Sequence, residues 1–363
     1  MVDPVGPRVL RACSTTARQV SFATAPLVVI LGPTASGKSA LGLALAERYR
    51  GEIVNCDSVQ VYRGFDVGAG KVPIEERRGI PHHLLDLVGP EQLFTAGDYR
   101  REAVRALESI RERGRLPVLV GGTGLYLRAL LNGLFEGPPR SESLRARLKS
   151  VANRRSRRGN KEGGPIRPES AGQSDPADGP APAEALHRWL RRLDPTSAAR
   201  IHPRDAQKVL RAIEVCLLAR QPMSRMLERG RAGLTGFAVL KIGLNPDRAQ
   251  LYERINRRVE GMFAAGLIEE TRGLLAGGDA SRLKPLEALG YRQAAAALSG
   301  EITREEALLV TQAATRQYAK RQMTWFRRET EVTWFAGFGD DPEIQRQIFD
   351  WLPLQRGFQH ASA

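Results

Sequence analysis

The stretch Gly32–Ser39, which reads GPTASGKS, decides the fold. It matches the pattern G-x-x-x-x-G-K-S/T, in which backbone N–H groups wrap phosphate oxygens and the lysine adds a mobile positive charge. The apolar run Leu27–Leu31 before it predicts a buried strand, and the apolar spacing in Lys38–Arg50 after it predicts a helix. We therefore predict a phosphate site formed by Gly32, Pro33, Thr34, Ala35, Ser36, Gly37, Lys38 and Ser39.

The same motif predicts a magnesium site. The hydroxyl of Ser39 can bind Mg²⁺, which commonly accompanies phosphate in loops of this kind. The pattern indicates a bound phosphate and does not by itself indicate hydrolysis.

Strands and helices alternate after the phosphate loop. Apolar segments at 52–56 and 116–120 predict strands, and 98–113 predicts a helix between them. Such alternation is typical of an α/β protein with a mostly parallel sheet, in which ligands bind beyond the carboxyl ends of the strands. Asp57 and Thr123 each directly follow a strand, so we expect both to meet the phosphate loop at one cleft.

Each of these two polar residues has two open interpretations. The carboxylate of Asp57 can accept a proton from an incoming amine or hydroxyl beside a bound diphosphate, or it can cap the next turn. The hydroxyl of Thr123, in the run GGTG, can donate a hydrogen bond to a phosphate or to a transferred group, or it can cap a helix.

Charged helices replace this alternation from residue 140 onward. We predict these helices at 142–155, 183–193 and 204–220. On the last, Arg204, Lys208 and Arg211 share a basic face, and the opposite face is apolar. A strand is predicted again at 237–244, and the remainder of the chain is predicted to be helical.

The simplest domain organisation is an α/β core interrupted by a helical insertion. The predicted parts are a disordered extension at 1–25, the core at 26–139, the insertion at 140–235 with a flexible Gly- and Pro-rich run at 156–182, completion of the core with C-terminal helices at 236–351, and a tail at 352–363. The composition of the extension fits a transit peptide, a bacterial extension or a misplaced start equally well.

Composition narrows the class of partner. With 55 Lys and Arg against 40 Asp and Glu, the formal charge is +15, which favours a polyanion such as nucleic acid, although a basic surface can also serve solubility alone. The cysteines, Cys13, Cys56 and Cys216, form no C-x-x-C motif and indicate a reducing, cytoplasmic setting. No apolar run approaches the ~20 residues that span a bilayer, so we expect no membrane segment.

Several further blocks, taken with the phosphate loop, resemble one family. They are DSVQVYRGFDVGAGK from Asp57, PHHLLD from Pro81, VGGTGLYLRALLNG from Val120, AARIHPRDAQKVLRAIEV from Ala198, GYRQ from Gly290 and TRQYAKRQMTWF from Thr315. In this order they resemble the tRNA dimethylallyltransferases, also called isopentenylpyrophosphate transferases, over residues 26–326. The resemblance implies a P-loop NTPase-like core with a parallel sheet, interrupted by an inserted helical tRNA-binding subdomain. No Cys/His pair suggests the zinc finger of eukaryotic relatives, so the bacterial type is expected.

The resemblance also implies a reaction. Members transfer a dimethylallyl group from dimethylallyl diphosphate to N6 of the adenosine that adjoins the anticodon, in tRNAs reading codons that begin with U. It implies that Asp57 is the base at N6, that Thr123 lies near the reacting carbon, and that Lys38 and Ser39 with Mg²⁺ neutralise the leaving diphosphate. Arg258 resembles an arginine that binds the same diphosphate, with Arg254 and Arg257 as alternatives.

The partners implied by the resemblance are the tRNA anticodon stem-loop and dimethylallyl diphosphate, with the protein a monomer. The residues implied to contact tRNA are Asp57, Ser58, Val59, Gln60, Arg145, Gln207, Lys208, Val209, Leu210 and Arg211.

Two departures and three alternatives remain. Phe65 replaces the family's usual Met, and GAGK at 68–71 stands where GTAK is common, which puts fine substrate positioning in question. A P-loop kinase would consume ATP and have little need of basic inserted helices, whereas an RNA-binding NTP switch would form no product. A prenyltransferase acting on free adenine nucleotides is disfavoured by the HPRDAQKVLR and GYRQ segments.

Overall fold

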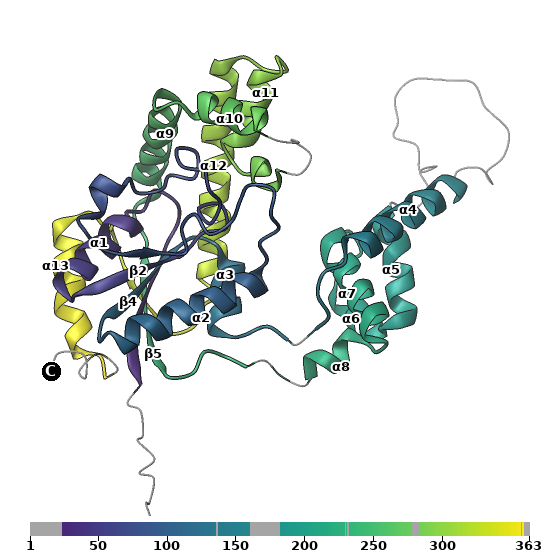
Figure 1. The fold of residues 1–363 in the computed structure, drawn as a ribbon, viewed down its shortest axis with the longest axis horizontal. Coiled ribbons are helices and arrows are strands. Elements are labelled where there is room, and N and C mark those ends of the chain that lie inside the picture. Colours follow the sequence, from purple (N-terminus) through teal and green to yellow (C-terminus); the bar gives the residue numbers. More distant parts are fainter. Residues whose placement is uncertain are drawn as a thin grey trace, which may run out of the picture. The chain divides into compact units, whose positions relative to one another are not determined.

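The first part of the fold is a six-stranded parallel sheet. The computed structural model describes residues 24–356 and 358, apart from 136, 160–181, 229, 231 and 278–282. The sheet has the order β3-β2-β4-β1-β5-β6, and every neighbouring pair is parallel (Figure 1). The strands are β1 (Ala25–Leu31), β2 (Gly51–Cys56), β3 (His82–His83), β4 (Leu116–Gly121), β5 (Phe237–Leu244) and β6 (Val332–Phe335).

The central strands read as apolar runs because both of their faces are covered. Strand β1 pairs with β4 on one side and with β5 on the other, so that Val28 lies opposite both Val118 and Leu240. Val28 and Val118 are fully buried. A parallel sheet needs such sequences since neither face meets water. The predicted α/β class with a parallel sheet is confirmed.

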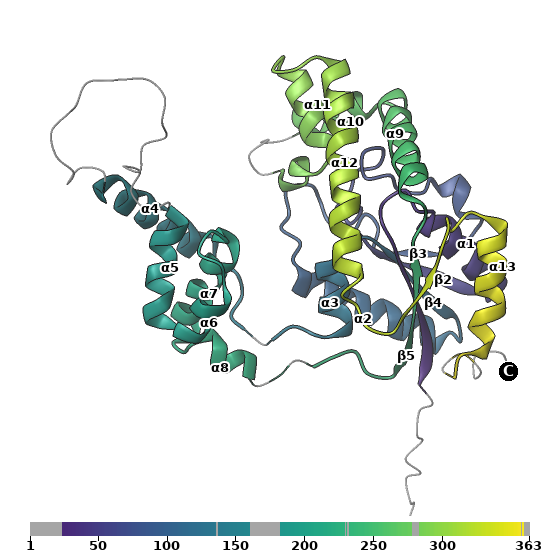
Figure 2. The same cartoon turned by 180° about the vertical axis from the view of Figure 1, so that it is seen from behind.

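Two groups of helices accompany the sheet (Figures 1 and 2). Helices α1 (Lys38–Arg48) and α13 (Pro342–Trp351) share one buried apolar cluster with the strands, through Leu41, Leu45, Ile344 and Ile348. Helices α9 (Arg248–Ala264), α10 (Leu267–Ala276), α11 (Tyr291–Leu298) and α12 (Arg304–Phe326) lie together in both views. Short 3-10 helices occupy Ile74–Arg77, Lys284–Glu287 and Leu352–Leu354.

The chain divides into two compact units. The first comprises Met1–Glu91, Ala106–Gly122 and Thr235–Ala363, and the second comprises Gln92–Arg105 and Thr123–Leu234. Helix α2 (Ala96–Glu112) begins in the second unit and ends in the first. The other helices of the second unit are α3 (Gly124–Leu131), α4 (Glu142–Gly159), α5 (Pro182–Leu193), α6 (Pro195–Arg200), α7 (Ala206–Ala219) and α8 (Met223–Glu228).

The second unit is larger than the predicted insertion at 140–235. Leu234 donates its N–H to the carbonyl of Leu131 (3.0 Å), and Tyr99 stacks on Tyr126 with ring centroids 4.2 Å apart. These contacts join α3 and the start of α2 to the returning chain. Residues 92–105 and 123–139 therefore group with the helical unit and not with the sheet.

Two further expectations need correction at the C-terminal end. The segment after β5 was expected to be helical throughout, but Val332–Phe335 forms β6 beside β5. The expected tail at 352–363 begins within the core, because Leu352 is fully buried and Phe358 packs edge-on against Tyr49 (5.0 Å between centroids).

The expected disordered and flexible segments fall largely outside the described residues. Residues 1–23 and 160–181 are not described. The residues at the edges of the two expected segments that the structure does describe belong to regular elements. Ala25 begins β1, α4 continues to Gly159 and α5 begins at Pro182.

A buried ion-pair network ties the helical unit together. The fully buried carboxylate of Glu214 on α7 accepts hydrogen bonds from Arg145 Nε (3.0 Å) and Nη2 (2.9 Å) and from Arg211 Nη1 (2.7 Å). Burial alone would raise the pKa of Glu214, but the hydrogen bonds from Arg145 and Arg211 outweigh it and lower the pKa to about 2. The carboxylate is therefore ionised and stabilises both arginines.

Glu214→Ala is expected to destabilise the helical unit by about 3–5 kcal/mol, because it leaves the buried Arg145 guanidinium without its counter-charge. Hydrogen exchange of the α4, α5 and α7 amides measures the loss. The control is Glu184→Ala, which removes a carboxylate 3.7 Å from the exposed Arg204 and should cost less than about 1 kcal/mol. Equal exchange in the two variants would contradict this role.

The same ion pair predicts a dependence on pH. The folded pKa of Glu214 lies below the ordinary value of 4.5, so its stabilisation is fully present above that pH. It is lost as the pH falls through the folded pKa of about 2. Glu214→Gln should therefore flatten the acid limb of the exchange profile, and an unchanged limb would argue against the pair.

Candidate functional site

The phosphate loop lies between β1 and α1, as predicted. Gly37 has a φ of 82°, and a Cβ there would lie 2.7 Å from the backbone nitrogen of Gly339, so only glycine fits. The Nζ of Lys38 donates to the carbonyl of Pro33 (2.6 Å) and folds back across the loop. Ser36 is fully buried within it. The loop leads directly into the N-terminus of α1, a position that favours an anion.

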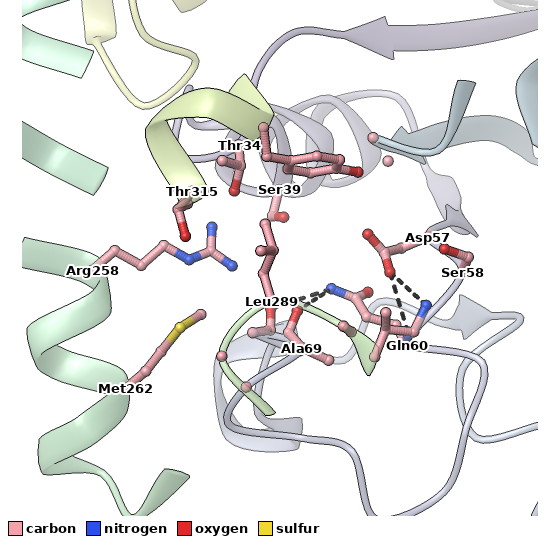
Figure 3. A pocket seen from close by; sticks show the side chains of 18 of the residues that line it. Thr34, Ser39, Asp57, Ser58, Gln60, Ala69, Arg258, Met262, Leu289 and Thr315 are labelled. Atoms are coloured by element: carbon pink, nitrogen blue, oxygen red, sulfur yellow. Dashed lines mark hydrogen bonds between the residues drawn. The ribbon is translucent and has the colours of Figure 1, made fainter. Parts of the chain in front are cut away.

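A cavity of about 530 Å³ opens from this loop (Figure 3). Its walls come from distant parts of the first unit: the loop, the carboxyl ends of β2 and β4, the segment 68–72, helices α9 and α12, and residues 287–290. Of the predicted site residues, those that line it are Thr34, Lys38, Ser39, Asp57, Ser58, Val59, Gln60 and Arg258. The sheet therefore brings the predicted phosphate residues and the segment after β2 to one cavity.

Asp57 is both a cavity residue and a turn cap. Its Oδ1 accepts the N–H groups of Val59 (2.8 Å) and Gln60 (3.3 Å), which fixes the carboxylate in the wall (Figure 3). The two interpretations of this residue are thus compatible. A fixed carboxylate facing a cavity is suited to acid–base chemistry.

Two cations face this carboxylate across the cavity. Burial, together with the nearby charge of Arg258, lowers the pKa of Lys38 to about 7, while Asp57 acts to raise it. Burial also lowers the pKa of Arg258, and Asp57 again opposes the shift. Lys38 is nevertheless only half-buried and Arg258 is exposed, and both line the cavity, so a bound anion can reach the two cations.

The three candidate arginines of α9 have different surroundings in the structure. Arg254 forms an ion pair with Asp340, with Nη1 2.9 Å from Oδ1, and Arg257 is mostly exposed and 3.5 Å from Glu253. Arg258 alone of the three lines the main cavity. All three border a second hollow beside the phosphate loop.

Sequence reasoning missed Gln322. Its Oε1 accepts the N–H of Thr34 (2.8 Å), and its Nε2 donates to the carbonyl of Gly122 (3.0 Å). This side chain of α12 therefore connects the phosphate loop to the end of β4. One sequence pattern could have indicated this residue. Four residues of α12 that line the cavity are spaced so that they share one helical face: Thr311, Thr315, Tyr318 and Gln322.

The remainder of the TRQYAKRQMTWF block is divided between packing and surface. Phe326 is buried, whereas Arg321 lines the cavity and is exposed. Phe326 therefore belongs to the core, whereas Trp325 is half-buried.

Thr123 is grouped with the second unit. It occupies the position before α3, where its carbonyl accepts the N–H of Leu127 (3.1 Å) and its side chain makes no capping hydrogen bond. Its expected place beside the reacting carbon stays a prediction.

Three of the residues expected to contact tRNA are buried inside the second unit. Val209 and Leu210 belong to its apolar core, and the Arg145 side chain is held by Glu214. Their contact with tRNA stays a prediction, although in this structure protein encloses each of the three side chains. Gln207 and Lys208 are exposed, and Arg211 is half-buried.

Magnesium would have few protein ligands here. Within the described ranges, no group of three or more His, Cys, Asp or Glu side chains could hold a metal ion. The Ser39 hydroxyl and the Asp57 carboxylate nevertheless line the same cavity and are oxygen ligands. Mg²⁺ is commonly bound by one or two such groups together with substrate phosphates, so these residues fit it.

No helix in the described part of the chain is both long enough and apolar enough to cross a bilayer.

Pyrophosphate binding near pH 8 is expected to take up about one proton more in the wild type than in Lys38→Arg. The reason is that Lys38, with a pKa of about 7, is mostly neutral there and becomes charged beside the anion, whereas arginine is already charged. Calorimetry in buffers of different ionisation enthalpy measures this uptake. The difference should vanish near pH 6, and equal uptake at pH 8 would contradict it.

Comparisons with known proteins identify the family of the chain. Residues 60–329 match the family model described as IPP transferase. The chain is 51% identical over 325 residues to a tRNA dimethylallyltransferase of Solibacter usitatus, covering 90% of this chain and 97% of that one. It is 54% identical over 323 residues to a tRNA dimethylallyltransferase of Koribacter versatilis, covering 88% and 95%.

Solved structures of tRNA-modifying transferases are also similar to this chain. The tRNA isopentenylpyrophosphate transferase of Bacillus halodurans has a TM-score of 0.61 and 36% identity, covering 93% of this chain and 98% of that one. A eukaryotic dimethylallyltransferase acting on tRNA has a TM-score of 0.71 and 25% identity, covering 89% and 78%. The chain described here belongs to the IPP transferase family.

Proposed function

We propose that this protein transfers a dimethylallyl group from dimethylallyl diphosphate to tRNA and releases diphosphate. The observation that carries the proposal is the single cavity in which the phosphate loop and Arg258 face the Asp57 carboxylate. The relatives, which are a tRNA dimethylallyltransferase and a tRNA isopentenylpyrophosphate transferase by name, support the same reaction.

The acceptor in this proposal is N6 of the adenosine adjoining the anticodon, in tRNAs reading codons that begin with U. The N6–carbon bond forms as the allylic carbon–oxygen bond breaks, and the bonding electrons leave with the diphosphate. Asp57 takes the proton from N6, since its carboxylate is fixed by Val59 and Gln60 and lines the cavity. A flipped-out base is required, because N6 cannot reach such a cavity from within a stack.

The leaving group is assigned to the opposite wall. The loop amides, Lys38 and Arg258 would stabilise the charge that develops on the departing diphosphate. Ser39 would hold Mg²⁺, whose charge helps to neutralise the diphosphate when bound. An exocyclic adenine amine is a poor nucleophile, so alignment of the amine with the allylic carbon contributes much of the rate. Thr123 is proposed to act near that carbon.

RNA binding is proposed at two places. Ser58, Val59 and Gln60 adjoin Asp57 in the cavity wall and would contact the target nucleotide. In the helical unit, the proposed contacts for the anticodon stem-loop are Gln207, Lys208 and Arg211. The formal charge of +15 of the whole chain favours binding of a polyanion such as RNA. We propose a monomer acting in the cytoplasm.

Protein incubated with Mg²⁺, radiolabelled dimethylallyl diphosphate and unmodified tRNA should label the tRNA without ATP. A kinase would require ATP, and an RNA-binding switch would form no labelled product. Absence of label, or a strict requirement for ATP, would overturn the proposed function.

Asp57→Asn is expected to lower kcat by about 10²–10⁴-fold while leaving tRNA affinity unchanged. The amide oxygen can still accept from Val59, so the turn is kept while the base is lost. Filter binding measures the affinity and the labelling assay measures the rate. Asp350→Asn, at an exposed position on α13, is the control and should match the wild type. Near-normal turnover by Asp57→Asn would remove Asp57 as the base.

A further inference from the structure

The segments that follow β1 and β4 enter the cavity wall beyond the end of their strand pairing. The register of these two parallel strands runs as far as Ile30 opposite Val120. After that pair, β1 leads into the phosphate loop and β4 leads to Gly122. The pairing therefore does not fix Thr34 of the loop relative to Gly122, and another contact must do so.

The side-chain amide of Gln322, on α12, makes this contact. It accepts from the N–H of Thr34 at 2.8 Å and donates to the carbonyl of Gly122 at 3.0 Å. A peptide unit of a central strand likewise accepts on one side and donates on the other. Gln322 is only 6% exposed, so the two protein partners replace water at this amide. The amide thus joins the two segments where the strand pairing has ended.

Helix α12 also packs against the next residue of the loop. Ala35 has a φ of 63°, a left-handed conformation that costs free energy in any residue other than glycine. Such a conformation persists only where surrounding contacts hold it. Ala35 packs against a buried cluster of Leu251, Ile255 and Ala319, the last of which belongs to α12. Two successive loop residues are therefore held by this helix, Thr34 by a hydrogen bond and Ala35 by packing.

Other hydrogen bonds to the loop backbone come from the loop itself or from main chain. Lys38 Nζ donates to the carbonyl of Pro33 (2.6 Å), and the N–H of Gly339 donates to the carbonyl of Ser36 (2.9 Å). Among the residues that the structure describes, Gln322 is the only side chain from outside the loop that hydrogen-bonds to its backbone. A substitution at this position therefore removes one defined contact of the loop.

Tyr318, which precedes Gln322 by one helical turn, helps to orient the amide. Burial and the charge of Asp57 raise the pKa of the Tyr318 hydroxyl, and a hydrogen bond with Gln322 acts in the opposite direction. The amide nitrogen of glutamine has two hydrogens, so it can donate both to the Tyr318 hydroxyl oxygen and to the carbonyl of Gly122. The amide nitrogen therefore faces two acceptors, and its oxygen faces the N–H of Thr34.

We propose that Gln322 is a positioning residue for the phosphate loop. Its amide fixes Thr34 relative to the end of β4 before a ligand binds, so the loop does not have to be ordered at the moment of binding. The N–H of Thr34 is given to Gln322, and the diphosphate is bound by other groups of the loop and by Lys38. The inference rests on the proposed function in one respect, the assignment of the diphosphate to this loop.

The first test compares Gln322→Leu with Gln317→Leu by calorimetric titration with pyrophosphate and Mg²⁺. Gln317 lies on the same helix but is exposed, so the same change of side chain is made away from the loop. Gln322→Leu should weaken pyrophosphate binding by about 10-fold, because the loop must then be ordered when the ligand binds, and Gln317→Leu by less than about 2-fold. Equal affinities in the two variants would overturn the proposal.

Gln322→Glu separates positioning from a general loss of packing. A protonated carboxyl accepts through one oxygen and donates through the other, as the amide does, whereas an ionised carboxylate only accepts and repels the carbonyl of Gly122. Burial raises the pKa of the introduced carboxyl above its ordinary value of about 4.3, so the neutral form is favoured as the pH falls.

At pH 5.5, Gln322→Glu should therefore bind pyrophosphate about 5-fold more tightly than Gln322→Leu, and at pH 8 it should bind no more tightly. The other titratable groups of the cavity are the same in both variants, so their effects cancel in this comparison. Loss of the negative charge alone would only make the two variants equal at pH 5.5. That equality would show that the pair of hydrogen bonds does not position the loop.

Hydrogen exchange of the Thr34 amide tests the contact without a ligand. In Gln322→Leu this amide should exchange at least about 10-fold faster than in the wild type, while the amides of β1 keep their protection. Unchanged exchange at Thr34 in a folded variant would contradict the proposal. If β1 also loses protection, the comparison at pH 5.5 still decides, because protonated Gln322→Glu restores both hydrogen bonds.

These experiments also separate the inference from the proposed function. Pyrophosphate binding is measured without tRNA or prenyl transfer, so the effects of Gln322 can appear even if the wild type fails to label tRNA. That result would reject the proposed function alone. Conversely, normal labelling by the wild type together with equal pyrophosphate affinities of Gln322→Leu and Gln317→Leu would reject the positioning role alone.

Discussion

The parallel pairing of β1 with β4, and of β4 with β2, is the constraint on which the site depends. Because these strands run in one direction, their carboxyl ends reach the same edge of the sheet. The register places Cys56 opposite Gly121, and a Cβ on Gly121 would lie 2.2 Å from the carbonyl oxygen of Cys56. Asp57 therefore emerges beside the end of β4, and a slip of one residue would turn its neighbours to the other face of the sheet.

The C-terminal helices contribute the remaining side chains of the cavity. Gln322 accepts from Thr34, which lies 288 residues earlier in the chain, and Arg258 enters the cavity from α9. Glu270 of α10 accepts hydrogen bonds from the backbone of Val67 and from the hydroxyl of Tyr291, next to the cavity wall. The sheet positions the phosphate loop and the Asp57 carboxylate, whereas the helices bring Arg258 and Gln322 to the same cavity.

Sequence patterns were informative where the signal is local. The phosphate loop, the apolar runs of β1, β2, β4 and β5, and the apolar face of α7 could all be predicted, and Val209, Ile213 and Cys216 are buried. Strand β6 has only four residues, too few for a recognisable period. The hydrogen bonds of Gln322 and Glu270 join segments that are remote in sequence, so no local sequence pattern predicts them. The sequence around Arg145 does not show that this arginine is buried, because its partner Glu214 lies 69 residues later in the chain.

The charges that line the cavity suit the proposed departure of a diphosphate. Lys38 and Arg258 are cations whose pKa values are lowered chiefly by burial, and Asp57 is the carboxylate whose charge opposes both shifts. While Asp57 is ionised, it competes with a diphosphate for the two cations. In the proposed reaction Asp57 accepts a proton from the amine, which would end that competition and leave both cations to act on the charge developing on the leaving oxygen. Under this proposal, proton transfer at one wall and departure of diphosphate at the other would reinforce each other, and prenyl transfer to an amine needs both.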